Sequence, residues 1–414
     1  MTAAGSGLSS LEIATGMVFG ARPGTLPEPT GAPPLAAMEA AIRPALLRPP
    51  CVVSFSGGRD SSAVLAVATA LARREGLPLP VPATNVFPDV GDTDEREWQE
   101  RVVRHLGLSD WLRVQHTVEL DLLGGHAQRL LRRHGLLWPF NVHFHAPLLE
   151  LCAGGSLLTG VGGDELFGAA QRDRAAAVIA RCVRPEPRDV LRLGLSLAPV
   201  AVRRSVLARR GLVALPWLRP PGQRRLESRL GDWGARMPRH LAGRLGWVWR
   251  SRYLAVATAA LDRLASDEDV RVVHPLLAGP LWAEVGRVAP PAGFAGRTDG
   301  MRWLFGGLLP EEICARRGKA QFDAAFWTGR ARAYSESWDG TGVPGEWVDP
   351  RALAAHWRSG RPLANSFTLL QAAWLESVQG VEQPVHGLVG EVPAPGAAQL
   401  QEGEAAQVDQ ACRA

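Results

Sequence analysis

Two glycine-rich turns, each between a short apolar run and a helical pattern, constrain the fold of this chain most strongly. The first, SGGRDSS at 56–62, follows CVVSF and opens an apolar helical pattern that stops at Gly76. The second, VGGDELFG at 161–168, follows SLLTG. This order is typical of parallel α/β sheets, whose ligands bind beyond the carboxyl ends of the strands. We therefore expect both turns to border a ligand site.

The stretch between the two turns continues the alternation of strand and helix. PATNVF and WLRVQHTV are typical of strands, whereas HAPLLELCAGG is typical of a helix. A further helix is predicted over 92–107, where Asp92 and Glu95 have the spacing of a capping box. The pattern predicts an α/β fold with a doubly wound parallel sheet.

The chain divides by composition into four predicted parts. Residues 1–48 form a loose lead-in with one helix near LAAMEAAIRPALL, and 49–172 form the α/β core. Strand signals fade over 173–382, where Arg, Leu, Ala and Trp recur in helical periods, so we expect a mostly helical second part. Residues 386–414 are poor in large apolar side chains and are predicted to be a disordered tail.

Charge and cysteine content narrow the function classes. The formal net charge of +5 comes from arginines scattered along all 414 residues, which favours a solvated surface over a nucleic-acid platform. Five cysteines without a CxxC pair indicate neither a disulfide framework nor a zinc site. No signal peptide or membrane span is predicted, so we expect a cytoplasmic protein that binds neither nucleic acid nor membranes.

The first turn has the composition of a phosphate site. Two glycines after a strand let the backbone turn sharply and direct N–H groups at an anion, which the following helix N-terminus also attracts. Ser56, Ser61 and Ser62 add hydroxyl groups. Asp60 would repel phosphate unless a cation such as Mg²⁺ joins it. The spacing differs from GxxxxGK[ST], which excludes the P-loop of kinases and GTPases.

The second turn repeats this logic. Gly160 and Val161 are small enough for the backbone to approach a flat ring or a ribose, and Asp164 would be a second carboxylate for the same metal. An Asp-Glu pair that opens a helix is more often a cap than a ligand. Because this pair occurs together with the first glycine-rich turn, we favour the interpretation that Asp164 is a metal ligand.

Together the two turns resemble the asparagine synthetase family, which has an SGGxDSS loop and, about a hundred residues later, a GxGxDExFGG loop. DVRVVHPLL at 269–277 is similar to the family's E-x-R-x-P-F-L-D segment. RTDGMRWLFGGLLPEEICARRGKAQF at 297–322 resembles its K-x-x-L-R...LP-x-x-I-x-x-R-x-K-x-x-F stretch. The resemblance covers about 51–380 and implies a PP-loop fold of the adenine nucleotide alpha hydrolase type.

The resemblance also implies roles for individual residues. Lys319 falls on the family's catalytic lysine, and Asp60 and Asp164 would bind Mg²⁺ and take part in catalysis. The carboxylate substrate would attack the α-phosphorus of ATP, pyrophosphate would leave, and an amine or ammonia would attack the acyl-adenylate. The pyrophosphate would be held by Ser56, Gly57, Gly58, Asp60, Ser61 and Ser62, and the nucleoside would be lined by Phe55, Val86, Gly160 and Val161.

Lys319 is the single lysine of a chain with 46 Lys plus Arg residues. An ammonium is a compact cation that can release a proton, whereas a guanidinium is a planar fork that stays charged. A solvated surface lysine is the ordinary alternative, but its coincidence with the family's lysine favours a role at the phosphates. The neighbours Arg316 and Arg317 are expected to be ordinary surface charge.

Several departures from the family bear on the substrates. Residue 2 is Thr, not the Cys of the glutamine-using members, so glutamine hydrolysis within this chain is not expected. Val161 stands where many asparagine synthetases have Glu, and Ala278 where an Asp is usual. These differences weaken the case for aspartate and ammonia more than the case for adenylation. His143 and His145, in LLWPFNVHFHAPLL, are candidate contacts to the acyl substrate, although lone histidines are more often structural.

Alternatives therefore remain open. Members that resemble lasso-peptide cyclases and β-lactam synthetases close an amide ring on the same ATP site. The carboxylate would then be a small molecule or a peptide, and the partner a separate glutaminase or a precursor peptide. A second alternative is a PP-loop enzyme that acts on tRNA, although such an enzyme would be expected to have a catalytic cysteine pair or a dense basic face. A third is a non-catalytic ATP-binding subunit.

Overall fold

The computed structural model describes residues 7–171, 178, 181, 184–209, 213–316, 318 and 322–382. Lys319, Arg317 and the predicted tail at 386–414 lie outside the described residues. In the part of the chain that is described, no helix is both long and apolar enough to cross a bilayer.

A five-stranded parallel sheet forms the centre of the α/β part, in the order β3-β2-β1-β4-β5. Val52 of β1 is paired with Val81 of β2 on one side and with Leu157 of β4 on the other. The chain runs outward from β1 to β3 and then returns to the opposite side, so the order reverses at β1. Such a reversal opens a crevice at the carboxyl ends of β1 and β4. The strands are β1 (Cys51–Ser54), β2 (Val81–Val86), β3 (Leu112–Gln115), β4 (Ser156–Leu158) and β5 (Arg271–Val273).

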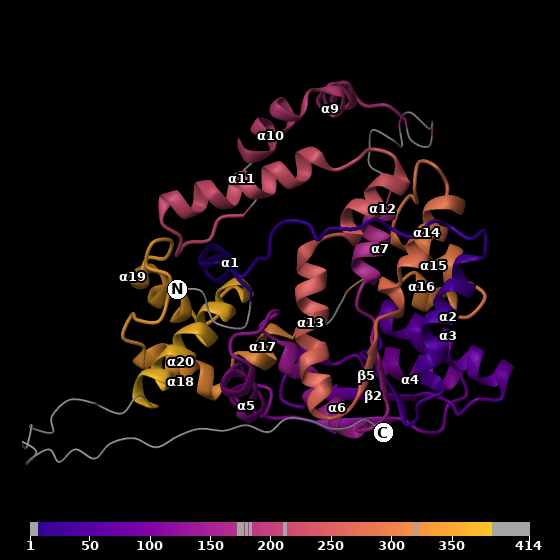
Figure 1. The fold of residues 1–414 in the computed structure, drawn as a ribbon, viewed down its shortest axis with the longest axis horizontal. Coiled ribbons are helices and arrows are strands. Elements are labelled where there is room, and N and C mark those ends of the chain that lie inside the picture. The colour runs from indigo at the N-terminus through magenta and orange to yellow at the C-terminus, as the bar shows by residue number, and fades with distance from the viewer. Residues whose placement is uncertain are drawn as a thin grey trace, which may run out of the picture.

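Helices cover both faces of this sheet (Figure 1). Val53 lies in a buried cluster with residues of α2 and α3, whereas the neighbouring Val52 lies in a different cluster with residues of α6 and α13. Successive residues of a strand point to opposite faces, so these short strands are apolar throughout. The prediction of a doubly wound parallel α/β sheet is confirmed. The helices of this part are α2 (Pro34–Leu46), α3 (Arg59–Glu75), η1 (Gly91–Thr93), α4 (Arg96–His105), α5 (Gly125–His134), η2 (Val142–His145), α6 (Ala146–Leu151) and α7 (Gly163–Ala170).

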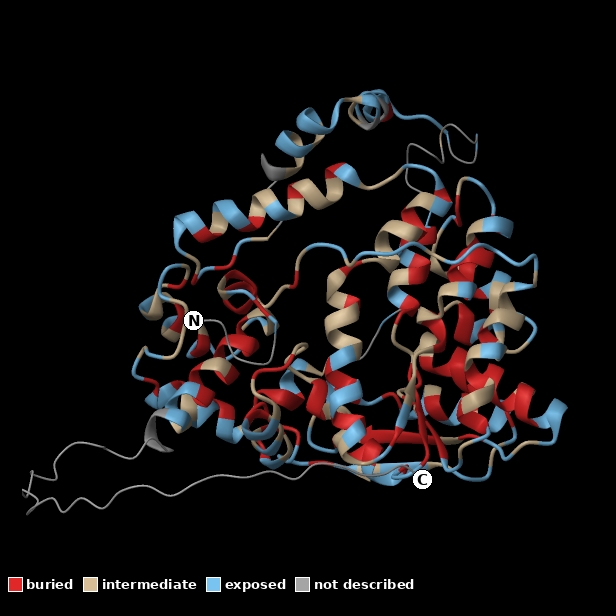
Figure 2. Cartoon of the chain, in the orientation of Figure 1, coloured by how far each residue is buried: buried red, intermediate tan, exposed pale blue. Residues whose placement is uncertain are grey.

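In the rest of the described chain, the regular secondary structure consists of helices and the strand β5. Figure 2 shows that α9 and α10, above α11, are largely exposed, whereas buried residues gather around the sheet. The helices are α9 (Pro187–Leu197), α10 (Val200–Arg209), α11 (Pro220–Arg236), α12 (Leu241–Trp249), α13 (Arg252–Asp267), η3 (Pro275–Leu277), α14 (Gly279–Val288), α15 (Arg297–Phe305), α16 (Glu311–Cys314), α17 (Asp323–Phe326), α18 (Gly329–Ser337), α19 (Pro350–Trp357), η4 (Ala364–Ser366) and α20 (Phe367–Glu382).

Three local features differ from the expectations. The fifth strand, β5, lies in the segment that was expected to be helical; it has three residues, too few for a periodic signal. The predicted capping box of Asp92 and Glu95 is wrong, because Asp92 lies in η1 and the Glu95 side chain pairs with Arg316 instead. The lead-in contains a second helix, α1 (Ser10–Thr15), whose Ala14 oxygen accepts a hydrogen bond from the buried Trp217 ring at 2.8 Å.

Candidate functional site

The first glycine-rich turn joins β1 to α3 as a loop held by its own serines. Gly57 has φ +79°, which a side chain would strain, and a Cβ added there would lie 2.7 Å from Gln99 Cγ. The Ser56 and Ser61 hydroxyls lie 3.2 Å apart, and the Gly58 amide donates to Ser56 Oγ at 3.3 Å. Serine oxygens, loop amides and the start of α3 are therefore gathered at the end of β1, where an anion would be attracted.

The second turn joins β4 to α7 and touches the first. A Cβ on Gly160 would lie 2.8 Å from the Ser61 backbone nitrogen, and a Cβ on Gly163 would lie 2.2 Å from Asp60 Oδ1. Gly162 has φ +103°, and Leu277 of η3 packs against it. Only glycine permits this approach, so the glycines that the sequence singled out bring the two turns together at one edge of the sheet.

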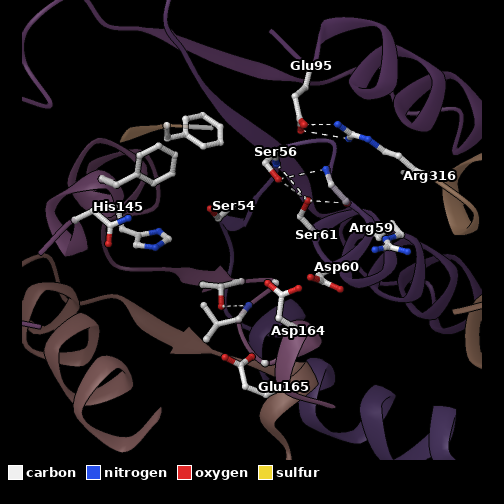
Figure 3. A pocket seen from close by; sticks show the side chains of 18 of the residues that line it. Ser54, Ser56, Arg59, Asp60, Ser61, Glu95, His145, Asp164, Glu165 and Arg316 are labelled. Atoms are coloured by element: carbon white, nitrogen blue, oxygen red, sulfur yellow. Dashed lines mark hydrogen bonds and ion pairs between the residues drawn. The ribbon is translucent and has the colours of Figure 1, made fainter. Parts of the chain in front are cut away.

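A cavity of about 400 Å³ opens where the two turns meet (Figure 3). The predicted residues that line it are Ser56, Gly58, Asp60, Ser61, Gly160, Val161 and Asp164. The predicted residues that do not line it are Phe55, Gly57, Ser62 and Val86. Of these, Phe55 and Ser62 are buried below the loop, and Val86 is the last residue of β2.

The two predicted metal carboxylates converge on one cation. Figure 3 shows Asp60 and Asp164 side by side. Arg297, the first residue of α15, donates from Nη2 to both oxygens of Asp60 at 2.6 and 2.5 Å, and its Nη1 pairs with Asp164. The two carboxylates, Asp60 and Asp164, are 104 residues apart in the sequence, and they are close enough to share a single positive group.

This pair of carboxylates fits Mg²⁺ only in part. Mg²⁺ prefers oxygen ligands and commonly takes one or two carboxylates, with the remaining positions filled by waters and substrate phosphates. Across the described ranges, no group of three or more His, Cys, Asp or Glu side chains could hold a metal. Asp60 and Asp164 thus suit a metal that shares its coordination with a phosphate ligand.

Arg316 is buried, which corrects the expectation that it is surface charge. Only 7% of the residue is exposed, and its guanidinium pairs with the buried carboxylate of Glu95. Its Nη1 also donates to the Gly57 oxygen at 2.7 Å, and the guanidinium carbon lies 5.0 Å from the centre of the Trp98 ring. Arg316 therefore fastens the first turn to the segment that precedes Lys319.

Lys319 itself lies outside the described residues, so its side chain has no described position. The residues that flank it, Gly318 and Phe322, both line the cavity. Described residues that precede and follow the predicted catalytic lysine therefore lie at the cavity.

The two candidate histidines differ in their surroundings. His143 is buried, contacts the Leu120 oxygen at 3.0 Å and lies outside the cavity lining, which indicates a structural role. His145 lines the cavity. Burial lowers the pKa of His145 to about 4, and burial together with the nearby His145 lowers the pKa of His274 to about 4. Both imidazoles are therefore neutral at pH 7.

The polar residues of this cavity that sequence reasoning missed include Glu95, Asn141, Arg297 and, in this role, Arg316. Arg297 and Arg316 lie within the 297–322 segment that resembles the family, which was a usable signal. For Glu95 and Asn141 the sequence contained no signal that marked them as site residues.

A second cavity, of about 610 Å³, lies beside the first. It is formed by residues 16–21 together with side chains of α11, α12 and α13. Aromatic rings dominate its walls: Phe19, Trp138, Trp233, Trp247 and Tyr253.

The walls of the two cavities are joined by one hydrogen bond. The Tyr253 hydroxyl, in the second cavity, lies 3.2 Å from Glu165 Oε1, in the first. Burial, followed by the Glu165 charge, raises the pKa of Tyr253, so its phenol stays protonated and can donate. A residue that lines the second cavity thus contacts a residue that lines the first.

Comparison with known proteins identifies the family. A search of curated proteins finds no match to this chain. The family model described as asparagine synthase matches residues 37–376, a span that includes both glycine-rich turns, Asp60, Asp164 and the segment around Arg316. The match covers most of the 414 residues. The chain belongs to the asparagine synthase family.

Proposed function

We propose that this protein, an ATP-dependent amide ligase by its family, adenylates a carboxylate with release of pyrophosphate and then passes the acyl group to an amine or ammonia. The observation that carries the proposal is the convergence of Asp60 and Asp164 on one cation beside the Ser56–Ser61 loop. An anion-attracting loop and a pair of carboxylates in contact form the arrangement expected of a site for Mg²⁺-bound phosphates.

In this proposal the chain's own residues bind and orient ATP. Backbone N–H groups of the first turn and the hydroxyls of Ser56 and Ser61 hold the pyrophosphate, while Asp60 and Asp164 hold Mg²⁺, which supplies charge neutralisation at the phosphate oxygens. Arg297 pairs with the same carboxylates, so it competes with Mg²⁺ for them.

Both chemical steps balance without a further reagent. A carboxylate oxygen forms a bond to the α-phosphorus, and the bond from that phosphorus to pyrophosphate breaks. The amine nitrogen then bonds to the acyl carbon, AMP leaves with the electron pair of the broken C–O bond, and the amine loses a proton. Lys319 is proposed to offset the charge on the departing pyrophosphate, a role that suits a compact ammonium.

The test is ATP–pyrophosphate exchange against a panel of carboxylates that includes aspartate and peptides. Exchange is expected with at least one acid, only with Mg²⁺ present, and is expected to fall by at least about a hundredfold in Asp60→Asn and in Asp164→Asn. ATP binding without AMP formation from any acid would instead favour a non-catalytic ATP-binding subunit. A salt-dependent gel shift with bulk tRNA would favour an enzyme that acts on tRNA.

A second candidate, favoured by the aromatic cavity, is a ligase of the lasso-peptide or β-lactam type that closes a macrolactam or lactam ring. The cavity of about 610 Å³ has more room than an aspartate side chain needs, and it shares the Tyr253–Glu165 hydrogen bond with the ATP cavity. Aromatic walls suit an apolar or peptide acyl chain.

The test of this second candidate compares two tryptophan variants. Trp233→Ala is expected to raise KM for a peptide carboxylate about tenfold without changing that for ATP. Trp303→Ala, on α15 and outside both cavities, is the matched control. Equal KM values in the two variants would count against a peptide acyl substrate in this cavity.

A further inference from the structure

A small cavity of about 80 Å³ adjoins the proposed ATP cavity. It shares four lining residues with the larger cavity, so the two are neighbours across a common wall: Asn141, Phe144, His145 and Val161. The remainder of its lining is mostly apolar and comes from α13, the 139–142 loop and His274. We call this cavity, with its ten lining residues, the annex.

Two histidines of the annex lining each have an imidazole nitrogen without a partner among the described residues. These are Nδ1 of His145 and Nε2 of His274, and both atoms are buried. The other ring nitrogen of His274 lies 2.6 Å from Thr159 Oγ1, which also accepts a hydrogen bond from the Val161 amide at 3.3 Å. Thr159 therefore holds the His274 ring while its second nitrogen stays available.

Such atoms require a hydrogen-bond partner, either a bound water or a ligand. Buried polar atoms are nearly always hydrogen-bonded, because removing one from water without a partner costs about 1–3 kcal/mol. Two unpaired nitrogens on residues that line one cavity, beside a proposed reaction centre, are better explained by one polar group that binds there than by two unrelated losses of a hydrogen bond.

The character of the annex restricts that group. Among the residues that the structure describes, no charged side chain lines it, and burial favours the neutral form of both histidines by lowering their pKa values. The same surroundings disfavour a carboxylate, which would find no cation, and an ammonium, which would be poorly solvated. A neutral amine avoids both penalties and offers N–H groups to imidazole lone pairs. The volume holds roughly two or three water-sized groups, enough for ammonia or a terminal aminomethyl group.

We propose that the annex binds the amino nitrogen of the nucleophile in its neutral form, with His145 and His274 as its hydrogen-bond partners. The inference rests on the proposed function, since it assigns the amine to a place beside the adenylation site. The ligand class is ammonia or an unbranched primary amine. Because the annex keeps this nitrogen unprotonated, the amine remains a nucleophile while it is bound.

The test uses two substitutions that each remove one free nitrogen and replace the imidazole ring with a neutral amide. His274→Asn retains an atom near Nδ1 for Thr159 and removes Nε2, whereas His145→Gln removes Nδ1. In His274→Asn, whose residue lies outside the lining of the ATP cavity, ATP–pyrophosphate exchange is expected to stay within about twofold of wild type. KM for the amine in amide formation is expected to rise at least tenfold in each variant. His105→Gln, an exposed histidine on α4, is the control.

Wild-type protein provides a second measurement that does not depend on the folding of a variant. Methylamine is expected to act as a nucleophile at least a hundredfold better than tert-butylamine, which is too bulky for the annex. Similar rates for the two amines, or unchanged amine KM values in both variants with exchange intact, would overturn the inference and leave the proposed function standing. Absence of exchange with every carboxylate would overturn the proposed function itself.

Discussion

The Arg316 guanidinium donates a hydrogen bond to the main-chain oxygen of Gly57 at 2.7 Å, at the point where the first glycine-rich turn leaves β1. The same group pairs with Glu95, so one buried side chain connects the turn, the start of α4 and the segment before Lys319. The shape of the first glycine-rich turn thus depends on a residue 259 positions away in the sequence.

Arg316→Ala is expected to lower the free energy of unfolding by about 3 kcal/mol, because a buried carboxylate loses its guanidinium partner and Gly57 loses a hydrogen bond. Urea unfolding measures this change. Arg302→Ala, which removes an exposed pair with Glu311, is the control and is expected to cost much less, because solvent screens exposed ion pairs. Equal effects in the two variants would mean that the buried pair adds nothing to stability.

Removal of Arg297 is expected to strengthen metal binding in the absence of nucleotide. Its guanidinium lies against Asp60 and Asp164, so Arg297→Gln leaves the two carboxylates without this competing charge. Mn²⁺, a spectroscopic probe for Mg²⁺, is expected to bind at least about tenfold more tightly, equivalent to about 1.4 kcal/mol. Electron paramagnetic resonance titration of free Mn²⁺ measures the affinity.

Asp164→Asn in the Arg297→Gln background is the control for this prediction, and it is expected to return Mn²⁺ affinity to the wild-type level or below. If Arg297→Gln binds Mn²⁺ no better than wild type, the guanidinium and the metal do not compete for these carboxylates.

The parts of this molecule that the sequence predicted are those determined by neighbouring residues. Strand, glycine turn and helix follow one another along the chain, so the local sequence was enough to place the turns at 56–62 and 161–168 at the correct edge of the sheet. The close approach of Gly160 to Ser61 follows from the same rule, because carboxyl ends of adjacent parallel strands share an edge.

The features that the sequence did not predict depend on contacts between residues far apart in the chain. Arg297 reaches Asp60 across 237 positions, and no periodicity or turn chemistry marks it as a partner. The strand β5 pairs with β4 across 115 residues, Ser156 opposite Arg271, and three residues give no alternation to detect. The annex likewise joins residues 139–145 to α13 and to His274, which precedes η3, so its two free imidazole nitrogens could not be anticipated from the lone-histidine pattern.

Replacement of the single lysine tests its role directly. Lys319→Arg keeps the charge but substitutes a planar fork for a compact ammonium, so ATP–pyrophosphate exchange is expected to fall at least about a hundredfold, near 3 kcal/mol. ATP binding, measured by calorimetry, is expected to change much less. Arg330→Lys, on the exposed start of α18, is the reciprocal control and is expected to have no effect. Full exchange in Lys319→Arg would mean that any cation suffices.

Acid pH is expected to destabilise the fold through the two annex histidines. Their pKa values are about 4 in the folded protein against an ordinary value of 6.5, so below pH 6.5 the unfolded chain binds protons that the folded chain does not. The stability that the neutral rings provide is complete above pH 6.5 and is lost as the pH falls towards 4. Between pH 7 and pH 5 the loss amounts to about 2 kcal/mol for each histidine.

Urea unfolding at a series of pH values measures this slope. The double variant His145→Gln, His274→Asn has neither titrating ring, so its stability is expected to change less between pH 7 and pH 5 than that of wild type, by up to about 4 kcal/mol. The carboxylates of the chain titrate in both proteins and cancel in the comparison. Parallel curves for the two proteins would show that the rings accept protons as readily in the folded state as in the unfolded chain, and the neutral character assigned to the annex would then be wrong.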